Sequence, residues 1–143
     1  MSDLDLAKGE LFEENLTLVI VKNGHILFQT DSHRISGFLD AIEKCGSTLE
    51  SSSVADRVVG KAVALLCVYA KIKEVYAVVI SRKAQSIFKE YKIICHWQEM
   101  VETVLNIEKT GMCPLEKAAS DISKPDEAYR AFKLMRERMK SSK

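Results

Sequence analysis

Residues 54–81 read VADRVVGKAVALLCVYAKIKEVYAVVIS, and the apolar pattern of this stretch decides the fold class. Ala62–Ala70 is apolar almost all round, which indicates a helix buried on more than one side. The serines at 51–53 are good N-cap residues, so we predict one helix from there to about Ile72. Glu74–Ser81 carries apolar side chains on both faces, as interior strands covered by helices do. The stretch therefore predicts an α/β protein.

Toward the N-terminus, an Asn-Gly pair between two strand-like runs predicts a β-hairpin. The runs are Leu16–Val21 and Ile26–Gln29, and Asn23-Gly24 between them favours a type I′ turn. An amphipathic helix is predicted next, ending at Gly46, and its apolar positions are Ile35, Phe38, Leu39 and Ile42. Residues 2–14 predict a short acidic helix that precedes the hairpin.

Toward the C-terminus, helical and strand-like segments alternate. We predict a helix over 83–92, a short strand over 92–96, a helix or turn over 98–105, a short helix over 114–120 and an amphipathic helix over 125–139. This order after an opening hairpin predicts a three-layer α/β/α architecture, with a mixed sheet flanked by helices. Residues 1–143 form one domain in this prediction, because the chain contains no linker and no internal repeat.

The composition is typical of a globular protein with one core: 143 residues, of which 47% are apolar and 29% charged. A net charge of +1 provides no field that would attract DNA or an anionic membrane surface. The chain starts without a secretory signal and its longest apolar run is too short to span a bilayer, so we expect a cytoplasmic protein. The four cysteines lack paired spacing, which predicts free thiols. A homo-oligomer is compatible with these features.

The first group of candidate site residues lies at the start of the predicted helix 51–72. A helix N-terminus offers free N–H groups and a positive dipole end, which favour an anion or a polar ligand. Asp56 would bind a hydroxyl or amine of the ligand, and Arg57 and Lys61 would bind phosphate or carboxylate. Gly60 lies on the same small-residue stripe as Asp56, against which another group packs closely. The alternative is that Asp56 complements the helix dipole and the two cations are solvated.

Two further groups follow the predicted strand over 74–81. Ser81 comes directly after that strand, where ligands bind in α/β sheets, although serine at this position is more often a helix N-cap. In the stretch TGMCPLEK, Pro114 fits the first helical position and places Cys113 at the N-cap, which would lower the thiol pKa. Glu116 faces back toward Cys113, and the alternative is that it only caps the backbone.

With these segments in place, the chain resembles an uncharacterised prokaryotic family of small single-domain proteins with a cytidine-deaminase-like fold. Three stretches carry the resemblance: VADRVVGKA over 54–62, VYAVVIS over 75–81 and TGMCPLEK over 110–117. The resemblance implies an α/β/α domain whose pocket lies where a deaminase active site lies. It also implies the ligand class of that fold, a nucleotide, nucleoside or similar small polar metabolite.

Zinc deaminases need a His-x-Glu pair at one helix start and Pro-Cys-x-x-Cys at the next. In the predicted helix over 51–72, the chain has Asp56-Arg57-Val58 where the His-x-Glu pair would lie. After the following strand it has Ser81-Arg82-Lys83, with no cysteine. Both thiolate ligands and the proton shuttle are therefore missing, so we expect no metal and no cofactor.

We therefore interpret the chain as a metal-free binding domain whose pocket residues are Asp56, Arg57, Gly60, Lys61, Ser81, Cys113 and Glu116. Whether it is an enzyme is left open. The alternative is a divergent metal-dependent hydrolase or deaminase-related enzyme that uses Asp56, Cys113 and Glu116. A third interpretation is an interaction protein that docks a partner through the helix over 125–139, which requires an exposed apolar face on that helix.

Overall fold

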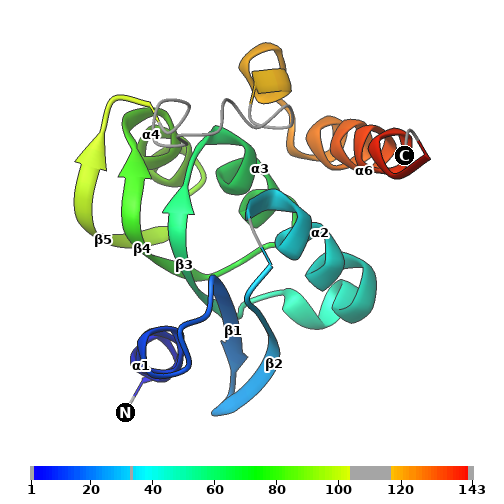
Figure 1. Ribbon diagram of the computed structural model, residues 1–143. Coiled ribbons are helices and arrows are strands. Elements are labelled where there is room, and N and C mark those ends of the chain that lie inside the picture. Colours follow the sequence, from blue (N-terminus) through cyan, green and yellow to red (C-terminus); the bar gives the residue numbers. More distant parts are fainter. Residues whose placement is uncertain (1, 33, 104–116, 142–143) are drawn as a thin grey trace.

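A five-stranded mixed sheet forms the centre of the protein (Figure 1). The computed structural model describes residues 2–32, 34–103 and 117–141. The strand order is β2-β1-β3-β4-β5, and the strands are β1 (Leu18–Lys22), β2 (His25–Thr30), β3 (Ser53–Val59), β4 (Glu74–Ser81) and β5 (Ile94–Val101). β1 is antiparallel to β2 and β3, whereas β3, β4 and β5 run parallel. The expected α/β fold with a mixed sheet flanked by helices is confirmed.

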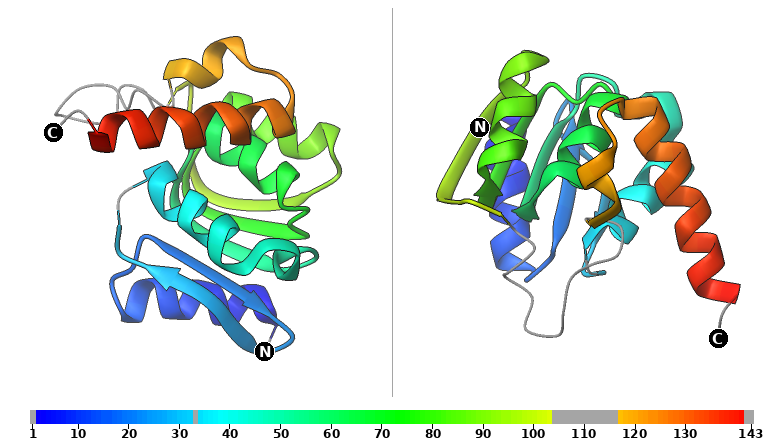
Figure 2. Two further views of the ribbon diagram at one scale, coloured as in Figure 1. Left: turned by 90° about the vertical axis from the view of Figure 1, so that its right-hand side faces the viewer. Right: turned by 90° about the horizontal axis from the view of Figure 1, so that it is seen from above.

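Helices cover the two faces of the sheet unequally (Figure 2). α1 (Asp3–Glu13) lies on one face, against β1, β3 and β4. The other face carries α2 (Arg34–Cys45), α3 (Lys61–Tyr69) and α4 (Arg82–Glu90), with α6 (Pro125–Ser141) packed outside them on α3 and α2. Two short 3-10 segments complete the described elements. η1 (Gly46–Leu49) follows α2 and leads to β3, and η2 (Ala119–Asp121) precedes α6. None of the helices described is both long and apolar enough to cross a bilayer.

The hairpin and the helix after it form as the local sequence predicts. Asn23 and Gly24 both have positive φ, 51° and 78°, which is the backbone of a type I′ turn. The carboxylate of Asp3 accepts hydrogen bonds from both turn N–H groups, at 2.8 and 2.9 Å, and so fastens α1 to the hairpin. Gly46 follows α2 with φ +54°, the left-handed conformation that commonly ends a helix.

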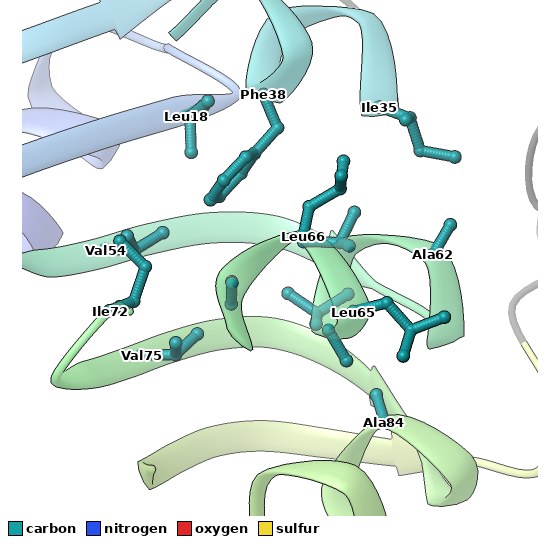
Figure 3. Packing of buried hydrophobic residues seen from close by; sticks show 14 of the residues in the cluster. Leu18, Ile35, Phe38, Val54, Ala62, Leu65, Leu66, Ile72, Val75 and Ala84 are labelled. Atoms are coloured by element: carbon teal, nitrogen blue, oxygen red, sulfur yellow. The ribbon is translucent and has the colours of Figure 1, made fainter. Parts of the chain in front are cut away.

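The main core lies between the sheet and the helices α2, α3, α4 and α6. Every residue from Ala62 to Cys67 of α3 is buried, so this helix is the central one, as predicted. Figure 3 shows Phe38 of α2 between Leu66 of α3 and Val54 of β3. A smaller apolar cluster under α1 includes Leu11 and Tyr76. Both faces of β4 are therefore covered, which explains its continuous apolar run.

The predicted single helix over 51–72 is wrong, because its first part is a strand. Ser53–Val59 forms β3, Gly60 follows as the N-cap residue, and the helix begins only at Lys61. Three valines favour the extended backbone here. A strand buried on both faces also lacks the alternating pattern that distinguishes strand from helix. Likewise, residues 98–101 continue β5 rather than forming a helix or turn.

Candidate functional site

Three helices begin at the same edge of the sheet. β1 is antiparallel to both of its neighbours, so β2, β3, β4 and β5 all point one way. Each of β2, β3 and β4 is followed by a helix that runs back across the sheet, namely α2, α3 and α4. Figure 3 labels Ile35, Ala62 and Ala84, which belong to the first turns of these helices and lie toward the same end of the core. We call this end, where β3 and β4 finish, the carboxyl edge.

Gly60, Lys61 and Ser81 meet at the carboxyl edge. Val59 of β3 pairs with Ile80 of β4, so the residues that follow these two are neighbours. Lys61 is the first residue of α3, and its Nζ donates to the carbonyl oxygen of Ser120 in η2 at 3.2 Å. Ser81 is the N-cap of α4, and its Oγ accepts from the N–H of Ala84 at 3.1 Å. Three of the predicted site residues are therefore brought together.

A second cation stands beside them. Arg82 is the first residue of α4, and its Nε lies 3.0 Å from Oε2 of Glu102, just beyond β5. The side chains are 66% and 80% exposed, so this ion pair adds little to stability and is easily exchanged. Lys61 and Arg82 thus place positive charge at two adjacent helix N-termini, where the dipoles add further positive potential.

Asp56 lies within β3 rather than at a helix start. It pairs with Leu18 and Ala77, and its side chain shares the sheet face of Val54, toward α3. Asp56 precedes Gly60 by four positions of extended chain, a rise of about 13 Å. Burial raises the pKa of Asp56 from 3.8 to about 7, while hydrogen bonds from the N–H groups of Val58 and Arg57 oppose the rise. Asp56 therefore lies behind the carboxyl edge as a buried carboxyl that titrates near neutral pH.

Arg57 points to the opposite face of the sheet, which corrects the prediction that it shares a site with Asp56. Its Nε donates to the carbonyl oxygen of Leu16 at 2.6 Å, and Nη2 donates to that of Leu11 at 3.1 Å. The guanidinium also lies 5.4 Å from the centre of the Phe12 ring. Successive side chains of a strand point to opposite faces of the sheet. Asp56 and Arg57 are therefore separated by the sheet, whereas a helix would keep their side chains closer together. Arg57 thus holds α1 on the sheet.

The remaining two candidates, Cys113 and Glu116, lie outside the described residues. The helix starts themselves can be compared with the deaminase motifs. Residues 34–36, at the start of α2, read Arg-Ile-Ser, and residues 61–63 of α3 read Lys-Ala-Val. Neither has the Glu of His-x-Glu, and the starts of α3 and α4 contain no cysteine. Within residues 2–32, 34–103 and 117–141, no group of three His, Cys, Asp or Glu side chains is arranged to hold a metal ion.

The described thiols are poor nucleophiles. Burial raises the pKa of Cys45 and Cys67, and that of Cys95 to about 12, and the negative charge of Asp56 raises the pKa of Cys67 further. Because the thiolate is the reactive form, iodoacetamide should label Cys67 and Cys95 slowly at neutral pH, with Cys113 labelled first. Mass-spectrometric mapping of alkylation against time measures this order. Rapid labelling of Cys95 in the folded protein would contradict it.

Comparison with known proteins places this α/β domain in a family. Residues 6–135 match the TM1506 family, a domain of unknown function (DUF1893). The chain therefore belongs to the DUF1893 family. The crystal structure of the family protein TM1506 from Thermotoga maritima matches with a TM-score of 0.81 and 26% identity, covering 92% of this chain and 89% of that one.

Two structures of RibD from Acinetobacter baumannii match over a smaller part. Both have a TM-score of 0.49, with 17% and 18% identity, and cover 59% and 67% of this chain but only 28% and 33% of RibD. No curated protein matches the sequence.

Proposed function

We propose that the carboxyl edge binds a small anionic metabolite of the nucleotide or nucleoside class. The observation that carries the proposal is the meeting of three helix N-termini at one edge, with Lys61 and Arg82 as the first residues of two of them. The aligned dipoles at such ends favour phosphate or carboxylate. Ligands of open α/β sheets bind outside the carboxyl ends of the strands, which is this edge.

Each residue has a separate role in this proposal. Lys61 binds the anionic group, exchanging its hydrogen bond to Ser120 for the ligand. Gly60 lets the ligand approach the backbone, and Ser81 lines the pocket beside it. Asp56 lies behind them, and Cys113 and Glu116 complete the lining on sequence grounds alone. The protein acts in the cytoplasm in this proposal, and it binds its ligand without zinc because the deaminase ligands are missing from the sequence.

Calorimetric titration with matched ligands tests the proposal. CMP and AMP carry the anionic group, while cytidine and adenosine lack it. Lys61→Gln removes one charge, and we expect it to weaken binding of both nucleotides about tenfold, the loss of about 1.4 kcal/mol, with nucleoside binding unchanged. Lys89→Gln is the matched control, since Lys89 is exposed at the far end of α4. Affinity for the nucleotides should also fall with added salt.

Two results would overturn the proposal. One is the absence of saturable binding by any of the four compounds. The other is equal nucleotide affinity for wild type and Lys61→Gln in protein that remains folded by circular dichroism.

A further inference from the structure

The opposite edge of the sheet, where α2 and α3 end, contains a separate cavity. It has a volume of about 800 Å³, within the range of small-molecule sites. One wall is made by the end of α2, by η1 and by the end of α3, and the other by α6. On α6, the stripe Tyr129, Lys133 and Glu137, at steps of four residues, faces this space. The cavity is thus built from elements distant in sequence and lies away from the carboxyl edge.

Charged side chains of both signs line this cavity, namely Glu43, Glu50, Lys71, Lys133 and Glu137. In the part of the chain that the structure describes, the side chains of Glu50, Lys71 and Lys133 make no hydrogen bond or ion pair. Glu43 is different, because its Oε1 accepts from Nη2 of the buried Arg136 at 2.6 Å. The last carbonyl groups of α2 and α3 add a negative potential on the Glu50 side. Each wall carries both signs, with Lys71 near Glu50 at the end of α3 and Glu137 near Lys133 on α6, and Glu50 and Lys133 provide one unpaired charge of each sign on the two walls.

An aromatic pair supplies the apolar part of the lining. The rings of Tyr69 and Tyr129 stack with centroids 4.5 Å apart and planes inclined by 16°, joining α3 to α6. Tyr69 remains 37% exposed, so ring surface is left uncovered. Ile42 of α2 also lines the cavity. Such a surface suits a flat apolar group, and the face of a tyrosine also attracts an ammonium.

We propose that this cavity binds a zwitterionic small molecule with an aromatic group, of the α-amino acid class. The ammonium lies between Glu50 and the ends of α2 and α3, the carboxylate binds Lys133, and the ring packs on the tyrosine pair. A ligand with one charge would leave either Glu50 or Lys133 without a partner. This site is independent of the one proposed at the carboxyl edge.

Titrations followed by amide NMR shifts of the full chain test the inference. The probes are L-phenylalanine and two analogues that each lack one charge, 2-phenylethylamine and 3-phenylpropionate. We expect phenylalanine to bind saturably and each analogue to bind at least about tenfold more weakly. Glu50→Gln, Lys133→Gln and Tyr129→Leu should each weaken phenylalanine binding by about fivefold or more. Lys61→Gln should leave it unchanged, which separates this site from the carboxyl edge.

Three outcomes would overturn the inference. One is no saturable shift with phenylalanine. Another is equal binding of phenylalanine and either analogue, which would make the cavity a site for a single charge. The third is unchanged affinity in both Glu50→Gln and Lys133→Gln. A Lys133→Arg variant keeps the charge and should restore binding, so that a loss in Lys133→Gln is not attributed to misfolding.

Discussion

Replacing Asp56 with asparagine should stabilise the protein above neutral pH and flatten the dependence of its stability on pH. The pKa of the carboxyl is raised by burial from 3.8 to about 7, so the folded state binds the proton more tightly than the unfolded state. Its favourable contribution is complete below pH 3.8 and is lost as pH rises through about 7. A rise in the pKa of Asp56 from 3.8 to about 7 corresponds to about 4 kcal/mol in the free energy of unfolding. Asparagine keeps the shape and has no charge to desolvate.

Urea unfolding of wild type and Asp56→Asn between pH 4 and pH 9 measures this effect. The difference in unfolding free energy between the two proteins should move in favour of the variant as pH rises, by up to about 4 kcal/mol. Other titrating groups cancel in this difference. Asp31→Asn, at an exposed position, is the matched control and should run parallel to wild type. Parallel curves for Asp56→Asn as well would show that the carboxyl ionises without a cost from burial.

Local signals were sufficient for much of the fold. The Asn-Gly turn, the Gly46 helix end and the cap at Ser81 depend on a few neighbouring residues, whose backbone preferences the sequence displays directly. β3 was missed because its identity depends on partners distant in sequence. β1 and β4 cover its two edges and helices cover both faces, so its valines carry no alternating pattern.

The candidate site was predicted in part, and the error in β3 explains the rest. Ser81 follows its strand as the sequence predicts, whereas Gly60 and Lys61, expected within a helix, are the N-cap and the first residue of α3. Asp56 and Arg57 were misplaced, because a strand directs them to opposite faces. That three helices start at one edge could not be predicted without the strand order. In that order β1 lies between β2 and β3, which point the same way because β1 is antiparallel to both.

The helix over 125–139 shows the limit of an amphipathic pattern. The sequence predicts one apolar face on this helix, and Ala128 and Phe132 on that face are fully buried. Arg136 lies on the same stripe and is also buried, with Nη1 2.6 Å from Asp40 and Nη2 2.6 Å from Glu43. Arg136 follows Phe132 by four residues, and this spacing indicates in the sequence that the two side chains share the inward face of the helix. The burial of Phe132 counts against a role for α6 as an exposed docking helix.

Phe132→Ala should be among the most destabilising single substitutions in the chain, at about 3–5 kcal/mol. Phe132 is 0% exposed in the main core, so its removal loses apolar contact and leaves a cavity under α6. The better helix propensity of alanine offsets only a small part of this. Leu134→Ala, on the same helix but 49% exposed, is the matched control and should change stability by less than about 1 kcal/mol. Urea unfolding of both variants measures the contrast. Equal and small effects would mean that α6 is held weakly and is free to leave the core, as a docking helix would be.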